Sequence, residues 1–208
     1  MMTIEFALFK LKPVLDELEF YEDVMQALEV QDEWVKQHMP HRYRRKRNLS
    51  SIYLAKTDPT CLLIVAPWDS PEAHQQWIDS EENRVASAKI SPYVANDDDA
   101  LIFFHMDAAG AHADVPRSFD EMASFDVCRF LVKAPEKSAV QDRYRNLEDA
   151  LVRLNLGDQI WGGWKVAQSG NTEELVIMSS QQKIPLELAA QKSRLCGKSE
   201  TQCFHQIC

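Results

Sequence analysis

The chain contains two kinds of hydrophobic pattern. Short runs with apolar residues at every second position predict strands, and longer runs with apolar residues at every third or fourth position predict helices. In the first half these patterns predict a strand from Ile4 and a long helix from Leu15 to Met39. Two further apolar runs, SSIYLAKT and CLLIVAPW, flank a turn at Asp58 to Thr60 and are typical of a β-hairpin.

A second helix is predicted to begin directly after this hairpin. Ser70 is a favourable N-cap, Pro71 suits the first helical position, and Glu72 lies in the first turn. The helix is expected to continue to the segment SPYVANDDD, after which ALIFFHMD predicts a last strand. The order of elements in the first half is therefore β-α-β-β-α-β.

The second half repeats this order. A strand is predicted from Ser124, and a helix from Lys137 to about Asp158 carries an apolar stripe that must be buried. The runs IWGGWKVAQ and ELVIMSSQQ predict a second hairpin, Pro185 to Arg194 a short helix, and TQCFHQI a last strand.

This order is typical of the ferredoxin-like fold, an antiparallel sheet with both helices on one face. We expect a first unit at 1–107, a small and polar linker at 108–123, and a second unit at 124–208 with a shortened last helix. Because each sheet would keep one uncovered face, two such units can pack sheet to sheet. The predicted fold class is α+β, with two ferredoxin-like repeats forming an α+β barrel that encloses a mostly apolar pocket.

The corner between the hairpin and the second helix, APWDSPEAHQQWIDSEE, carries a family pattern. A tryptophan at a strand end is followed by S-x-E-x-x-x-x-W-x-x-S, and Trp68, Ser70, Glu72, Trp77 and Ser80 match it. Together with the order of elements, this corner resembles the dimeric α+β barrel superfamily, especially its antibiotic-biosynthesis-monooxygenase-like branch. The chain resembles a tandem fusion of two such units.

This resemblance implies several kinds of chemistry. The superfamily includes cofactor-free monooxygenases that oxidise phenolic or anthrone-like substrates, polyketide cyclases, haem-degrading, dehalogenating and decarboxylating enzymes, and stress-response proteins. Its fold does not select among them. In the haem-degrading branch the helix after the corner tryptophan supplies a histidine about three turns on, but residues 80–96 contain no histidine. We therefore expect no haem and no other cofactor.

The charge and composition of the chain indicate which classes of binding partner are expected. The formal net charge of −9 disfavours broad binding to nucleic acid or anionic lipid. The exception is the basic run HRYRRKR, His41 to Arg47, which is either a site for phosphate, carboxylate or RNA, or a solvated loop that balances the acidic helix before it. The N-terminal residues do not form a secretory signal and no segment is apolar enough to span a membrane, so we expect a cytoplasmic protein.

The sequence lacks the common motifs of nucleotide-binding, hydrolase and metal sites. The sequence has no P-loop, GxGxxG, GxSxG or HExxH motif, and its five cysteines are widely spaced, which suits reduced thiols. His38 and His41 form an HMPH pair, but Pro40 breaks the helix that would align them and no third ligand is near. We predict no metal site.

Two histidines are candidates for catalysis. His74 shares a helix face with Trp77 and could act as a general base near neutral pH, or be a partly exposed helix residue. His105 lies on the apolar strand ALIFFHMD, on the same face as Phe103. It could contact a substrate, or be a core histidine with a hydrogen-bond partner.

Arg129 is the third catalytic candidate. Its neighbours Cys128 and Phe130 are expected to lie under the helices, which would point Arg129 into the barrel. A buried arginine requires an anion, so it could bind a carboxylate or an enolate. The alternative is an ion pair with an internal acid such as Glu5 or Asp126.

Five aromatic residues are candidates for substrate binding. Trp68 and Trp77 could form a pocket wall or lock the helix onto the sheet. Tyr53 could donate a hydroxyl and Trp164 a stacking surface, although both could equally be core residues. Phe103 would add an aromatic wall from the last strand of the first unit.

The leading hypothesis is a cofactor-independent enzyme of polyketide or other small-molecule metabolism. It would bind an aromatic or polycyclic substrate, take a proton from an acidic C–H or phenol with His105 or His74, and hold the oxyanion with Arg129. Oxygenation, cyclisation or rearrangement would follow. The alternatives are a non-catalytic ligand-binding or stress-response protein, and a scaffold whose basic loop is an interaction arm. No nucleic acid or membrane partner is expected, and a homodimer is left open.

Overall fold

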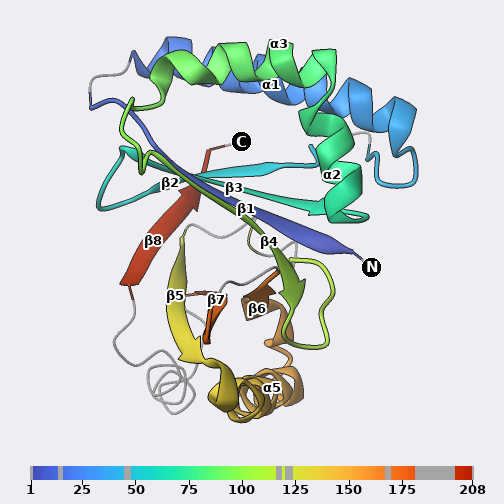
Figure 1. Cartoon of the computed structure of the whole chain (residues 1–208), viewed down its shortest axis with the longest axis vertical. Helices are drawn as coiled ribbons and strands as arrows, with labels where there is room; N and C mark the ends of the chain where they lie inside the picture. The colour runs from blue at the N-terminus through green and yellow to red at the C-terminus, as the bar shows by residue number, and fades with distance from the viewer. Residues whose placement is uncertain are drawn as a thin grey trace. The chain divides into compact units, whose positions relative to one another are not determined.

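The computed structural model describes residues 2–13, 16–44, 48–115, 119, 124–166, 170–180 and 200–207 (Figure 1). The chain forms two compact units. The first comprises Thr3–Phe103 together with Ile207, and the second comprises Phe104–Gln206. The boundary between the two compact units falls inside a strand rather than in a loop.

The first unit is a three-stranded sheet with helices on one face (Figure 1). Strand β3 lies between β1 and β2 and pairs antiparallel with both. The elements, in chain order, are β1 Thr3–Lys10, α1 Glu17–His38, β2 Ser51–Ala55, β3 Cys61–Trp68, α2 Pro71–Ile78, α3 Glu81–Ile90, the 3-10 turn η1 Ser91–Tyr93, and β4 Leu101–Ala108, which continues into the second unit. The hairpin and both predicted strands at the ends of the unit are confirmed.

The predicted helix after the hairpin is two helices, not one. It begins as expected, because the Ser70 side chain accepts a hydrogen bond from the backbone N–H of Ala73. It ends at Ile78, where Ser80 donates to the Trp77 carbonyl and caps the next helix by accepting from the Asn83 N–H. A serine that satisfies backbone groups on both sides stops one helix and starts another. The prediction of a continuous helix is therefore wrong.

In the described part of the second unit, one long helix lies on the sheet. Its elements are β5 Phe125–Lys133, the turn η2 Ala134–Glu136, α5 Lys137–Arg153, the turn η3 Gly157–Gln159, β6 Ile160–Lys165, β7 Thr172–Ser180 and β8 Glu200–Gln206. Strand β5 pairs with β7 and β8, and β6 pairs with β7 and β4.

One predicted helix of the second unit ends earlier than expected, and another cannot be compared with the structure. Helix α5 ends at Arg153 rather than near Asp158, because Asn155 adopts a left-handed backbone with φ of 58° that a helix cannot continue through. The short helix predicted at 185–194 falls outside the described residues.

Over the whole chain the strands follow the order β1-β3-β2-β8-β5-β7-β6-β4, which is the order of a closed barrel. This confirms the predicted α+β class with two ferredoxin-like repeats. The predicted boundaries of the two units and the linker at 108–123 stay a prediction.

The helix-covered face of each sheet forms a core. In the second unit Cys128 and Phe130 pack in a cluster with Tyr144 and Leu147 of α5, as the alternation of the strand predicted. In the first unit, Trp34 of α1 packs against Trp77 and Trp68, with ring centres 5.5 Å and 6.3 Å away. Trp68 and Trp77 therefore hold the helices onto the sheet.

None of the helices in the described part of the chain is both long enough and apolar enough to cross a membrane.

Candidate functional site

A cavity of about 470 Å³ lies between the sheet and the helices of the first unit. This volume falls in the range of small-molecule sites, about 300 to 1,000 Å³. Strands β1, β2, β3 and β4 line it from one side, and α1, α2 and α3 from the other. Its walls are mostly apolar side chains, among them Ala7, Phe9, Leu28, Ile52, Ile64 and Ile78. The chamber that the sequence predicted between the two sheets stays a prediction.

Glu5 is the acid in this apolar cavity. It lies on β1, and the alternation of the strand places it on the same face as Ala7 and Phe9, which also line the cavity. Only 8% of the residue is exposed. Its Oε2 accepts a hydrogen bond from Nε1 of Trp68 at 2.8 Å. Burial raises the pKa of Glu5 to about 7, although the Trp68 hydrogen bond opposes the rise.

His74 lies beside this carboxyl group. It is buried in the first half of α2, and its Nε2 is 3.4 Å from Oε2 of Glu5. The imidazole stacks on the Trp68 ring, with centres 4.3 Å apart and planes 9° from parallel. The edge of Phe103 meets it at 5.5 Å. The helix start at Ser70 and the stack on Trp68 hold the imidazole of His74 in place. The carboxyl group of Glu5 and this imidazole therefore lie side by side at the wall of the cavity.

Four of the residues predicted for the site therefore come together in the first unit. His74, Trp77 and Phe103 line the cavity, and Trp68 lies behind Glu5 and His74. Tyr53 does not join them, although it is only 1% exposed. Its neighbour Ile52 lines the cavity, so alternation along β2 turns Tyr53 to the opposite face of the sheet.

The remaining three candidates belong to the second unit. His105 is half-buried on β4 and does not line the cavity, whereas Phe103 does. Trp164 is a core residue under α5, and Nζ of Lys137 lies 5.1 Å from its ring centre. Both residues therefore belong to the second unit, and neither lines the cavity of the first unit.

Arg129 is paired with an acid that the sequence did not suggest. Its Nε and Nη2 donate to Oε1 of Glu174 at 2.9 Å and 2.6 Å. The guanidinium carbon also lies 5.7 Å from the ring centre of Phe104. The sequence named Glu5 and Asp126 as examples of such an acid, and Glu174 is an acid that reaches Arg129 across the β5–β7 pairing.

The sequence reasoning missed the acid of the cavity, Glu5, and its buried amide, Gln31. Glu5 entered it only as a partner for Arg129, and Gln31 of α1 was not considered. Both carried a signal, because each is a polar residue beside apolar residues on its face. Glu5 follows Thr3 on the face of Ala7, and Gln31 lies seven residues after Val24 on the buried stripe of α1.

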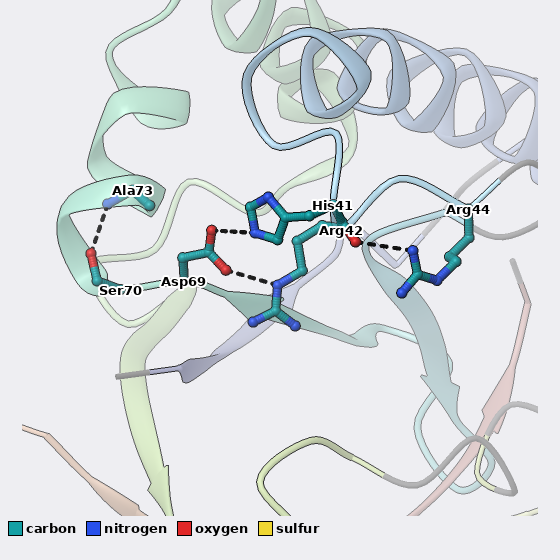
Figure 2. Close-up of polar contacts among 6 residues, drawn as sticks. All are labelled: His41, Arg42, Arg44, Asp69, Ser70 and Ala73. Atoms are coloured by element: carbon teal, nitrogen blue, oxygen red, sulfur yellow. Dashed lines mark hydrogen bonds and ion pairs between the residues drawn. The ribbon is translucent and has the colours of Figure 1, made fainter.

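The described part of the basic run is tied to the corner after β3. Figure 2 shows Asp69 between two basic side chains, with Nε2 of His41 at 2.7 Å and Nε of Arg42 at 2.9 Å. Arg44 donates to the backbone carbonyl of His41 (Figure 2). These contacts favour a loop anchored to its own protein, and residues 45–47 lie outside the described part.

A metal site finds no support among the residues that the structure describes, because no three or more His, Cys, Asp or Glu side chains cluster there.

The raised pKa of Glu5 predicts a pH-dependent stability. The group releases its proton at an ordinary pKa of 4.5 in the unfolded chain and at about 7 in the folded one. Stability from this residue is therefore complete below pH 4.5 and is lost as pH rises through about 7. The loss should be about 3 kcal/mol. Chemical denaturation at about pH 5 and about pH 8 measures the free energy of unfolding of both proteins. Between these two pH values the free energy of unfolding of Glu5→Gln, relative to that of the natural chain, should rise by this amount. An equal difference at both pH values would contradict the raised pKa.

Solved structures resemble this chain over its whole length. Two are crystal structures of a "putative monooxygenase". The one from Lactobacillus acidophilus NCFM is 7% identical, with a TM-score of 0.60, and covers 99% of this chain and 93% of its own. The one from Fusobacterium nucleatum is 10% identical, with a TM-score of 0.59, and covers 100% and 93%. An anthrone oxidase-like protein is 10% identical, with a TM-score of 0.57, and covers 100% and 92%.

No family model matches the sequence, and a search of curated proteins finds no match. At identities this low the likeness to the solved structures establishes the fold and leaves the activity open. The chain therefore has an α+β barrel fold made of two ferredoxin-like units, and it resembles these solved structures in that fold.

Proposed function

We propose that this protein is a cofactor-independent oxygenase of small-molecule metabolism that binds a flat aromatic substrate in the cavity of the first unit. One observation carries the proposal. A buried carboxyl group whose pKa is raised to about 7 lies at an apolar cavity, 3.4 Å from an imidazole. A base with a pKa near the working pH is the kind of group that proton abstraction requires.

The cavity suits an aromatic substrate. Trp77 and Phe103 offer aromatic surfaces, and the aliphatic side chains around them exclude water. A ring system between these walls would bring an acidic C–H group toward Glu5. The carboxylate form of Glu5 would take the proton, and His74 would hold the carboxyl group in place and share the proton that it receives.

The chemistry that follows needs only molecular oxygen. Removing a proton from an activated CH₂ group leaves a carbanion that is stabilised by the aromatic system. Oxygen adds to this carbon, the proton returns to give a hydroperoxide, and loss of water leaves a carbonyl. The overall change is CH₂ + O₂ to C=O + H₂O, so the substrate supplies all four electrons. One structural neighbour is described as an anthrone oxidase-like protein, and the proposal takes the same class of reaction rather than cyclisation or rearrangement.

Arg129 and His105 have no part in this proposal. Arg129 is neutralised by Glu174 in the second unit, and His105 does not line the cavity. The proton-transfer role that the sequence assigned to His74 is retained, with Glu5 as its partner.

The test is the oxidation of anthrone by the purified chain. The protein is incubated with anthrone in air with a metal chelator and without added cofactor, while oxygen uptake and anthraquinone absorbance are followed. We expect a rate above that of heat-denatured protein and of the Glu5→Gln variant. Binding of anthrone without any faster oxidation would instead support the alternative of a non-catalytic ligand-binding protein.

A further inference from the structure

Gln31 is a buried polar residue on an apolar helix face. It lies on the stripe of α1 that also carries Val24, Leu28 and Val35, and it is 7% exposed. Its side chain lines the cavity of the first unit. Among the described residues its Oε1 is one of the few buried side-chain oxygens that have no hydrogen-bond partner.

An unpaired acceptor in an apolar wall is unfavourable for the empty protein. Buried polar atoms in folded proteins are nearly always paired, because an unpaired one loses its hydrogen bonds to water without replacement. A leucine at this position would complete the stripe and avoid that cost. The amide oxygen is therefore explained by a partner that enters the cavity rather than by the packing of the protein.

Gln31 and Glu5 approach the cavity from opposite sides. Gln31 belongs to the helix layer and Glu5 to the sheet. The Leu49 N–H donates to the side chain of Asp32 at 3.3 Å, which ties the segment before β2 to the turn of α1 next to Gln31. Ser50 follows Leu49 and also lines the cavity. A ligand between the two layers would meet the base on one side and the amide oxygen on the other.

We propose that Oε1 of Gln31 accepts a hydrogen bond from a phenolic hydroxyl group of the ligand, so that the cavity selects hydroxylated aromatic rings. This rests on the proposed function in one respect, that the cavity takes an aromatic ligand. Phenolic substrates are a class that the resemblance already implied, and the new element is Gln31, which we assign as the residue that distinguishes a phenol from a ring without a hydroxyl group. The hydroxyl is the donor that the unpaired oxygen requires.

Binding of two matched probes tests this. 2-Naphthol and 2-methylnaphthalene have nearly the same shape, and only the first has a donor. Isothermal titration calorimetry with the natural chain should give at least about tenfold tighter binding of 2-naphthol. In Gln31→Leu the preference should disappear. Gln37→Leu, the same change on the exposed side of α1, should keep it.

Three results would overturn the inference. They are equal binding of the two probes by the natural chain, no binding of either probe, and a preference that survives in Gln31→Leu. Thermal unfolding gives an independent check, because Gln31→Leu should be at least as stable as the natural chain, whereas a structural glutamine would lower the melting temperature when replaced. Neither probe has the activated CH₂ group that the proposed oxidation requires. A preference would therefore stand even if anthrone were not oxidised, and its absence would leave that oxidation intact.

Discussion

Replacing Glu5 with glutamine is expected to lower kcat for the proposed substrate by about a hundredfold or more. The amide of glutamine has nearly the size of the carboxyl group and can still accept the hydrogen bond from Nε1 of Trp68. It cannot accept a proton, so the variant loses the base while keeping the shape of the cavity. Oxygen uptake at saturating substrate measures the effect.

The pH profile separates the loss of a base from a general disturbance. In the natural chain kcat/KM should rise with pH through about 7, because Glu5 acts only after it has released its own proton. In Glu5→Gln this rise should be absent. Glu22→Gln, a change of the same kind on the exposed side of α1, should leave both the rate and the profile unchanged. Unchanged turnover in Glu5→Gln would remove the carboxyl group from the mechanism.

Most of the fold could be predicted because its determinants are local. The alternation in β1 and β5, the apolar stripe of α5 and the Ser70 cap act over a few residues and specify their elements directly. The break between α2 and α3 was missed although Ser80 is itself a good N-cap. Apolar spacing continues across it, and spacing alone cannot distinguish one helix from two helices in series.

The site could be predicted only in part because its chemistry is not local. The corner pattern led to His74 and Trp77, which lie three residues apart on one helix. The raised pKa of Glu5 comes from burial under helices that follow it in the chain, and its hydrogen-bond donor, Trp68, is 63 residues away. A glutamate in a strand looks like a surface residue until the covering layer is known.

The same limit applies to Arg129. Its partner Glu174 is 45 residues away, and the two meet because Arg129 faces Val176 in the β5–β7 register, two residues beyond Glu174. Cross-strand diagonal neighbours of this kind are within reach of a long side chain. As long as the β5–β7 register is unknown, every acidic residue of the second half is an equal candidate for the partner of Arg129.

Replacing Arg129 with methionine is expected to lower the free energy of unfolding by about 3 kcal/mol. The change removes the guanidinium and leaves the Glu174 side chain, which is 9% exposed, as a buried carboxylate. Nζ of Lys165 remains at 3.6 Å and compensates only in part, so the loss should fall at the lower end for a broken buried pair. Urea denaturation measures it.

A second substitution distinguishes this ion pair from an anion-binding role. Adding Glu174→Gln to Arg129→Met removes the uncompensated charge, so the double variant should regain most of the lost stability. Oxidation of anthrone in the first unit should be unchanged in both variants at a temperature where they are folded. If Arg129 instead bound the oxyanion of the substrate, Arg129→Met would lower kcat/KM strongly, and Glu174→Gln would not restore it.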